Sequence, residues 1–444
     1  MKIGALPADP GPSGWSAILP EAPPPRPLET TVTADWLIIG AGVAGLAAAR
    51  RLSETRRGDR IVVLDATRVG EGPAGRNSGF MIDLPHDLAS DNYAGALAED
   101  QAQIADNRDA IDFALETAAA FDMPEEAIRK TGKINVAASP RGAAHNDAFA
   151  RHLDALGEPY ERLDASAMRA ITGSCFFTEG LRTPGAAIVQ PALFARGAAR
   201  GLSSNSVSIH ERSAVLSLTR CEDVWAAETQ RGSVRAPRVI LAVNGLVERF
   251  GRFKGRLAHV LTYASMTRAL NGKEVARLGG AREWAATPAD PLGTTVRRIS
   301  GIGGDRLVIR NRFHYAPSMA APDGWEADVA RTHDASFIAR FPMLAHVPMQ
   351  FRWGGRLCLS LNDAPAFGEI EEGLFAACCH NGLGLARGTF SGVAAADLAA
   401  GIDSRFARRQ SGRAGPRRLP PAPIATLGAR VKIAYGERRA GVEL

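Results

Sequence analysis

Cysteine, lysine and long apolar stretches are scarce in this chain. The 444 residues include five cysteines, an odd number without metal-ligand spacing, and the adjacent pair Cys378-Cys379 is a poor candidate for a disulfide. No apolar run reaches the roughly 18 residues that a membrane span needs, and no basic segment followed by an apolar stretch opens the chain. We therefore expect a reduced, cytoplasmic protein without a metal site and without membrane insertion.

Positive charge is concentrated in one place. The net charge is +6, but from Asp403 onward ten Arg or Lys stand against three Asp or Glu, so the rest is nearly neutral. Only six residues are lysine, against 47 arginines, and aromatic residues make up 6% of the chain. A nucleic-acid site would need basic residues combined with aromatic residues or a known motif, and neither accompanies this tail. The sequence therefore does not favour a nucleic-acid partner.

What the chain has in abundance is a pattern of buried strands and glycine turns. After a proline-rich arm (residues 1–30), the stretch "DWLIIG" predicts a buried strand, residues 43–54 a helix and "RIVVLDA" (60–66) a second buried strand. Such a βαβ unit implies parallel strands. Residues 258–315 contain three β-like segments, which favour an antiparallel sheet. We expect an α/β (α+β) fold in which a Rossmann-like domain is interleaved with an antiparallel-sheet domain.

The turn "GAGVAG" has the spacing of a dinucleotide-binding motif. Gly40 would permit the tight turn, Gly42 would let the backbone approach a pyrophosphate, and Gly45 would let helix and strand pack closely. The motif alone is weak in a glycine- and alanine-rich chain. The strand before it, the helix after it and Asp65 at the end of the next strand strengthen it, because that carboxylate could bind a ribose. The alternative is a structural turn with a solvated aspartate.

NAD and FAD share this motif, so other segments must distinguish them. "RVGEGPAGRNSGF" brings small residues and Asn77 to the end of the second strand, and "CCHNGLGLARGTF" (378–390) places glycines at another helix start. A return of the chain to the cofactor after more than 330 residues favours an extended flavin. A nicotinamide dehydrogenase would rarely need such a return of the chain.

Taken together, these segments resemble those of a known family. "IIGAGVAGLAAAR", "GRNSGF", "RAPRVILAVNGL", "WGGRLCLSLNDAPAFG" and "HNGLGLARGTFSGVAAADL" are similar to the FAD-dependent oxidases of the D-amino-acid oxidase and glycine oxidase superfamily, most closely the gamma-glutamylputrescine-oxidase-like amine oxidases. The resemblance covers nearly the whole chain, including the basic tail, which it makes a packed, solvated helix. It implies an FAD-binding domain (31–90, 185–250, 355–403), a substrate domain (91–184, 251–354) and a tail (404–444).

The resemblance also implies roles for single residues. In the cofactor site, Gly40, Gly42 and Gly45 would hold the pyrophosphate, Asp65 the ribose, and Arg68 would lie near the adenosine. Val215 would contact the adenine, and Asn244 and Gly245 would lie near the phosphates. The residues along the flavin ring would be Gly75, Arg76, Asn77, Ser78, Gly79, Asn381, Gly382 and Gly384. Gly355 stands where some relatives carry a flavin-linking cysteine, so we predict non-covalent FAD. None of Lys133, Lys254 and Lys273 can be assigned to oxygen activation, so oxidase and dehydrogenase both stay open.

The implied reaction is the oxidation of an amine or N-substituted amino acid by hydride transfer to flavin, giving an imine that hydrolyses. Candidate catalytic or substrate-binding residues are His86, His380, Arg356 and Arg298, with Arg310 equally placed on spacing. Each histidine could instead be structural, and each arginine could form a surface salt bridge. The partners would be a small amine and O2 or another acceptor, and the protein would be a monomer or homodimer. A flavin hydroxylase and a non-catalytic flavin-binding protein are the alternatives.

Overall fold

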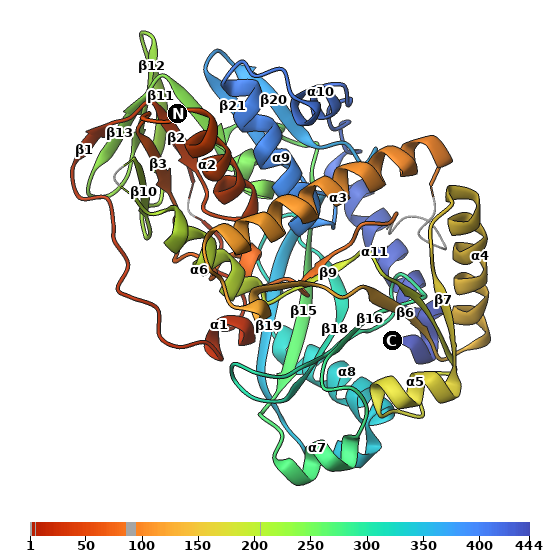
Figure 1. Ribbon diagram of the computed structural model, residues 1–444. Coiled ribbons are helices and arrows are strands. Elements are labelled where there is room, and N and C mark those ends of the chain that lie inside the picture. The colour runs from red at the N-terminus through yellow and green to blue at the C-terminus, as the bar shows by residue number, and fades with distance from the viewer. Residues whose placement is uncertain (1, 5, 86–94, 205) are drawn as a thin grey trace.

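Two large β-sheets dominate the computed structural model, which describes residues 2–4, 6–85, 95–204 and 206–444. One sheet lies with helices α2 (Val43–Thr55) and α9 (Gly384–Ala399) in the upper part of Figure 1. The other carries the long strands β15 (Ala258–Thr267), β18 (Arg306–Tyr315) and β19 (Met349–Leu359) through the centre. His86 lies outside the described residues. The expected mixed α/β architecture is confirmed.

The first sheet has six strands and contains the predicted βαβ unit. Their order is β10 (Val207–His210), β3 (Ile61–Leu64), β2 (Trp36–Ile39), β14 (Arg238–Leu241), β21 (Leu374–Cys378) and β20 (Ala366–Glu371). The first five strands run parallel, with Trp36 opposite Ile61 and Arg238, and only β20 is antiparallel. Because parallel strands end at the same edge, the loops after β2, β3, β14 and β21 meet there.

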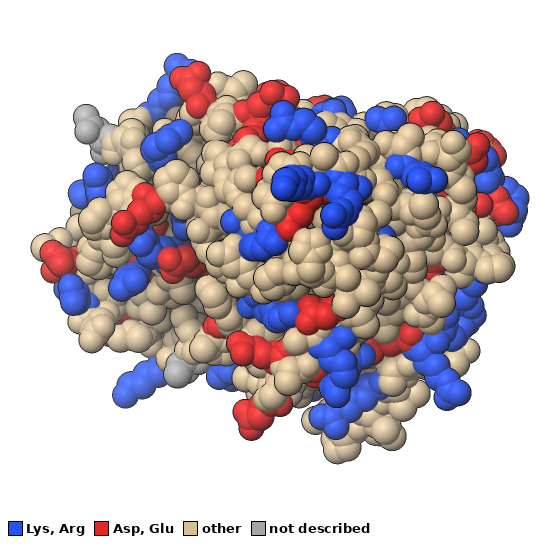
Figure 2. Space-filling model, turned by 90° about the horizontal axis from the view of Figure 1, so that it is seen from below, with Lys and Arg blue, Asp and Glu red and all other residues tan. Residues whose placement is uncertain are grey.

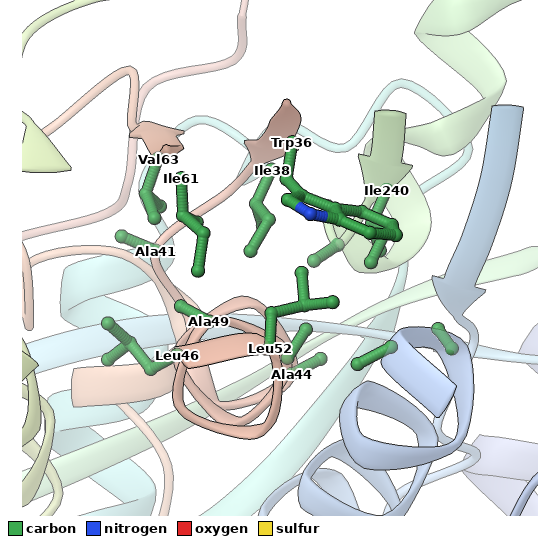
Figure 3. Packing of buried hydrophobic residues seen from close by; sticks show 14 of the residues in the cluster. Trp36, Ile38, Ala41, Ala44, Leu46, Ala49, Leu52, Ile61, Val63 and Ile240 are labelled. Carbon is green, nitrogen blue, oxygen red and sulfur yellow. The ribbon is translucent and has the colours of Figure 1, made fainter. Parts of the chain in front are cut away.

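Helix α2 (Val43–Thr55) packs its apolar face on this sheet. In Figure 3, Leu46, Ala49 and Leu52 of the helix point toward Ile38, Ile61 and Val63 of the strands. All of these side chains are buried. Burying one large aliphatic side chain contributes roughly 1.5–3 kcal/mol, so this layer anchors the start of α2 and the glycine turn before it.

A second helix, α9 (Gly384–Ala399), lies beside α2 in Figure 1, although more than 300 residues separate them. Two glycines of α9 allow the close approach. A Cβ on Gly392 would lie 2.1 Å from the Ala44 oxygen, and one on Gly388 would lie 2.8 Å from Val43. The Arg51 guanidinium of α2 also donates to the fully buried Asp397 carboxylate of α9, with Nε to Oδ1 2.6 Å. The two ends of the sequence are therefore locked together.

The second sheet has eight strands and includes the three that the sequence predicts between residues 258 and 315. Its order is β19 (Met349–Leu359), β15 (Ala258–Thr267), β18 (Arg306–Tyr315), β17 (Thr295–Ile299), β16 (Trp284–Pro288), β6 (Lys133–Ala137), β8 (Glu179–Thr183) and β7 (Glu161–Asp164). Every neighbouring pair is antiparallel except β16 and β6. The expected antiparallel sheet is confirmed, and it is larger than expected because β16, β19 and β6 to β8 join it.

Smaller elements complete the fold. Two short sheets consist of β1 (Thr31–Thr33), β13 (Ser233–Ala236), β12 (Val224–Glu228) and β11 (Ser217–Cys221), and of β4 (Phe80–Met81), β9 (Ala187–Val189) and β5 (Ile128–Lys130). The other helices are α1 (Gly14–Ala17), α3 (Leu97–Ala120), α4 (Pro140–Leu156), α5 (Ala165–Thr172), α6 (Pro191–Leu202), α7 (Gly272–Leu278), α8 (Trp325–Arg340), α10 (Arg405–Ser411) and α11 (Ala422–Ala440). Short 3₁₀ turns are η1 (Pro73–Gly75), η2 (Glu125–Ala127), η3 (Asn244–Phe250), η4 (Pro342–Leu344) and η5 (Gly441–Glu443).

The proline-rich arm is extended, as predicted, but it is not a detached segment. It runs from the neighbourhood of β11 to the short helix α1 and back to β1 (Figure 1). Trp15 of the arm is fully buried and Leu28 is 2% exposed. The composition predicts the extended backbone but not the docking, because docking depends on partners far away in sequence.

The basic tail is helical, but α11 is exposed along most of its length, including the side chains of Ile424, Leu427, Val431 and Tyr435. Only Ala440 of α11 is buried, while Arg340 of α8 donates to the Glu443 main-chain oxygen at 2.7 Å. Figure 2 shows basic and acidic side chains interspersed over the face seen from below. No helix in the described part of the chain is both long and apolar enough to cross a membrane.

Candidate functional site

A cavity of about 510 Å³ lies where the carboxyl ends of the parallel strands face the second sheet. Its walls come from the arm, the turn after β2, the end of β3, the 70–78 segment, the turn after β14, strands β15 and β19, and the loop before α9. Segments from the whole length of the chain thus contribute to one elongated space.

The three motif glycines have three different surroundings. Gly40 has a φ of +106°, and a Cβ there would lie 2.5 Å from the Ala242 oxygen. A Cβ on Gly45 would lie 1.8 Å from the Gly40 oxygen, so Gly45 serves packing and does not line the cavity. At Gly42 a Cβ would meet only Ala74, at 3.6 Å, and would point into open space at the helix start. This open start of α2, with no side-chain cap, fits a pyrophosphate.

Asp65 lies at the end of β3 and joins two walls of the cavity. Its Oδ2 accepts from the Ala41 amide at 2.8 Å, and its Oδ1 accepts from the Thr67 amide at 2.8 Å. Burial raises the pKa of this carboxyl, while the amide hydrogen bonds oppose that increase. Each carboxylate oxygen has more than one lone pair, so Asp65 can still accept from a ribose hydroxyl.

Other residues predicted for the adenylate half also line the cavity, but the Arg68 side chain is engaged by the arm. Val215, Asn244 and Gly245 line the cavity. Arg68 lines it too, but its Nη2 donates to the main-chain oxygens of Ala22 and Pro23 in the arm. Arg68 thus holds the arm.

The 75–79 segment contributes its three central residues to the cavity wall. Arg76, Asn77 and Ser78 line the cavity, whereas a Cβ on Gly75 would lie 1.8 Å from the Gly70 oxygen and one on Gly79 would overlap Arg297. These two glycines allow packing of the segment against its neighbours. Gly75 and Gly79, which the sequence also predicts along the ring, therefore do not line the cavity.

Side chains from the arm and from β19 fix the carbonyl groups of this segment. Ser13 Oγ donates to the Gly75 oxygen at 2.9 Å, Trp15 Nε1 to the Asn77 oxygen at 2.8 Å, and Trp353 Nε1 to the Arg76 oxygen at 3.0 Å. These contacts determine the path of the segment along the cavity. Sequence reasoning missed the arm residues, and the only signal was a tryptophan between two serines in a proline-rich stretch.

The loop before α9 forms the far end of the cavity. His380, Asn381, Gly382 and Gly384 line it, and α9 starts without a side-chain cap. Asn381, with a φ of +47°, accepts from the Ser360 amide at 2.7 Å through Oδ1. A bare helix start facing the cavity can stabilise negative charge on a bound ring.

Three of the ten non-glycine residues with a positive φ in the described part of the chain lie in the turns after β14 and β21. Asn244, Cys379 and Asn381 all have a positive φ, which is uncommon outside glycine. Asn244 Oδ1 accepts from Cys358 Sγ and from the Cys379 amide, both at 3.1 Å. These contacts hold the two loops in a conformation that costs free energy, as is typical of functional sites.

The structure brings two of the three described catalytic candidates into the cavity. His380 and Arg356 line it, as does Arg310. Arg298 instead lines a separate cavity of about 460 Å³, where it donates to the Gly279 main-chain oxygen and lies 3.8 Å from Asp305. We therefore exclude Arg298 from the proposed site. Lys133, Lys254 and Lys273 do not occur among the described residues that line the first cavity.

Cys358 and Gly355, both of β19, line the cavity. The neighbouring Cys379 thiol and burial raise the pKa of Cys358 well above its usual value. A thiol that stays protonated is a poor nucleophile, which agrees with the predicted non-covalent cofactor.

Burial keeps two histidines neutral. It lowers the pKa of His380 to about 4, with a smaller contribution from Arg387, and that of His333 to about 3. Neutral His380 can accept a hydrogen bond at Nδ1, which has no partner among the described residues. With this pKa, His380 is not protonated at neutral pH and cannot act as a proton donor in its imidazolium form.

These histidines predict how stability depends on pH. Between the folded pKa near 4 and the ordinary value of 6.5, the unfolded chain binds the His380 proton and the folded chain does not, so stability falls as the pH decreases. The full effect of His380 is about 3 kcal/mol. Urea unfolding from pH 7 to 4 should show a smaller loss for His380→Gln, and a still smaller one for the His333→Gln/His380→Gln pair. If the variants lost as much stability between pH 7 and pH 4 as the wild type, this would contradict a buried, neutral His380.

Known proteins match the chain along most of its length. The family model described as FAD dependent oxidoreductase (DAO) matches residues 35–398. Gamma-glutamylputrescine oxidoreductase of Escherichia coli (strain K12) is 26% identical over 393 residues, covering 85% of this chain and 86% of that protein. Probable oxidoreductase OrdL of Rhizobium meliloti (strain 1021) is 26% identical over 411 residues, covering 89% and 90%.

Solved structures share the fold. Glycine oxidase from Geobacillus kaustophilus superimposes with a TM-score of 0.70 at 18% identity, covering 88% of this chain and all of that chain. Iminodiacetate oxidase from Chelativorans sp. BNC1 gives a TM-score of 0.65 at 17% identity, covering 86% of this chain and all of that chain.

Proposed function

The chain belongs to the DAO family of FAD-dependent oxidoreductases, and from this premise we propose which reaction its cavity supports. It is an FAD-dependent oxidoreductase of the amine and amino-acid oxidase type. We infer that its substrate is a small amine, that the carbon beside the nitrogen is oxidised, and that the resulting imine hydrolyses. The supporting observation is the single cavity that joins the first glycine turn to the loop before α9.

The residues present fit FAD. The cradle at Gly42 is open where a Cβ would point into the cavity, and Asp65 at the end of β3 can accept from a ribose. In this proposal, Gly40 to Val43 bind the pyrophosphate, Asp65 the ribose, and Arg76 to Ser78 with His380 to Gly384 the ring. When bound, the flavin supplies a two-electron acceptor for the hydride. The division into an FAD-binding and a substrate domain, cut at the boundaries above, is part of the same proposal.

The remaining residues orient the amine and keep it reactive. A hydride leaves readily only from a carbon beside a neutral amine. Arg76 and Arg356 line the cavity with Asp9 between them, so positive charge exceeds negative charge in this group, and this excess disfavours the ammonium form of a bound amine. Neutral His380 can accept a hydrogen bond from the amine. The second sheet covers the cavity and limits the access of water.

The test is anaerobic mixing of the FAD-loaded protein with a panel of primary and secondary amines and amino acids. We expect at least one amine to bleach the flavin absorbance at about 450 nm and to yield a carbonyl product. Admission of O2 then separates an oxidase, whose colour returns at once, from a dehydrogenase. A protein that retains FAD and is reduced by no amine would favour the non-catalytic alternative. A cytoplasmic location and a monomeric or homodimeric state are further parts of the proposal.

A further inference from the structure

Arg356 lines the cavity and could bind a substrate carboxylate, yet the chain itself already contacts its guanidinium group. Its Nη2 lies 2.8 Å from Asp9 Oδ1, and its Nη1 donates to the main-chain oxygens of Pro7 at 3.1 Å and Ala8 at 3.0 Å. Both side chains of the Arg356–Asp9 pair are largely buried, at 12% and 14% exposure. Nε has no hydrogen-bond partner among the described residues, and neither has Asp9 Oδ1, so the contact between Nη2 and Asp9 is an ion pair. A substrate carboxylate that approached the Nε–Nη2 edge would meet Asp9 there.

Arg76, the second arginine of this group, is occupied by the same segment. Its Nη1 donates to the Gly11 main-chain oxygen at 2.8 Å, and its Nε lies 3.9 Å from Asp9 Oδ1. Asp9 thus lies between two cations of the cavity wall, where a carboxylate of a ligand could otherwise bind. In the described part of the chain, the hydrogen-bond acceptors of these two guanidinium groups are all main-chain oxygens of the arm.

Close steric fits hold the arm in this position. A Cβ on Gly11 would lie 2.3 Å from the Arg352 oxygen, one on Gly14 would lie 2.8 Å from the Trp353 ring, and one on Gly354 would lie 2.9 Å from Pro10. The Gly354 amide also donates to the Pro10 oxygen at 2.9 Å. Glycines on both sides of the contact therefore permit the approach, and Asp9, next to Pro10, has a fixed place beside Arg356.

We propose that Asp9 determines substrate specificity: it fills the carboxylate-binding position at Arg356 and Arg76, so the enzyme takes amines without a carboxylate on the reacting carbon. This inference rests on the proposed amine oxidation and narrows its substrate class. A substrate carboxylate would have to displace Asp9 and the Pro7 and Ala8 carbonyl groups. If Asp9 stayed in place, the substrate carboxylate would lie beside a second negative charge in a largely buried environment.

A binding experiment tests this without turnover. Acetate is titrated calorimetrically into the FAD-loaded wild-type protein, Asp9→Ala, Asp9→Asn and Asp9→Ala/Arg356→Met. We expect acetate to bind Asp9→Ala and Asp9→Asn at least about ten-fold more tightly than wild type, and the double variant to lose this gain. Glu21→Ala removes an exposed carboxylate from the same arm and serves as the matched control. Equal acetate affinity in wild type and both Asp9 variants would overturn the proposal.

A paired activity measurement tests the substrate class. Flavin reduction is followed with N-ethylglycine and with N-ethylmethylamine, which differ by the carboxylate on the carbon beside nitrogen. We expect Asp9→Asn to shift the ratio of the two rates toward N-ethylglycine by at least about ten-fold. A ratio that stays constant while acetate binding also stays constant overturns the role of Asp9. Absence of reduction by any amine counts against the proposed function, and the calorimetry still tests Asp9 separately.

Discussion

A Gly42→Val variant is expected to fold normally and to lose its FAD. Gly42 has a φ of −79°, which any residue can adopt, and a Cβ there meets only Ala74 at 3.6 Å. The added methyl groups would therefore occupy the open space at the start of α2, where the proposal places the pyrophosphate. We expect the affinity for FAD to fall by roughly a hundred-fold or more, about 3 kcal/mol. Flavin content after purification and titration of the apoprotein with FAD measure it.

Gly45→Ala provides the contrast. Its Cβ would lie 1.8 Å from the Gly40 oxygen, so this smaller change should reduce the yield of folded protein itself. Thermal unfolding of both variants separates the two effects. A Gly42→Val protein that retains full flavin would contradict the placement of the pyrophosphate.

Arg51→Met is expected to lower the free energy of unfolding by about 3 kcal/mol. The substitution leaves the Asp397 carboxylate, which has no exposed surface, without the guanidinium that contacts it at 2.6 Å. An unpaired buried charge is costly even when the lost pair was worth little, and the partial exposure of Arg51 keeps the estimate at the lower end of the range. Urea unfolding monitored by circular dichroism measures the change.

The double variant Arg51→Met/Asp397→Leu is the control. Removing both charges should restore much of the lost stability, because apolar side chains of similar volume can replace a buried pair. A single variant as stable as the wild type would mean that the contact between α2 and α9 is not a fixed part of the fold.

Local patterns predict the parts of the structure that depend on neighbours in sequence. Trp36 to Ile39 and Ile61 to Leu64 are continuous apolar runs, so both read as buried strands, and the glycine spacing places Gly42 at the helix start. Asp65 follows from the same argument, since the carboxyl ends of parallel strands share one edge of the sheet. These elements are where the sequence predicted them.

The arm shows why the rest could not be predicted. Its prolines indicate an extended backbone, but nothing near Asp9 in the sequence reveals its contact with Arg356, because the two residues are almost 350 positions apart. Arg298 illustrates the reverse error. Spacing along a strand suggested that it faces the substrate, whereas the strand order places it over a separate cavity. Contacts between sheets depend on topology, which periodicity alone does not specify.

The most direct test of the account is a crystal structure of the protein with FAD. We expect the pyrophosphate to lie at Gly42 and the start of α2, the ribose on Asp65, and the flavin ring in contact with His380 to Gly384. A ring bound away from that loop would contradict the claim that both ends of the chain enclose one cofactor.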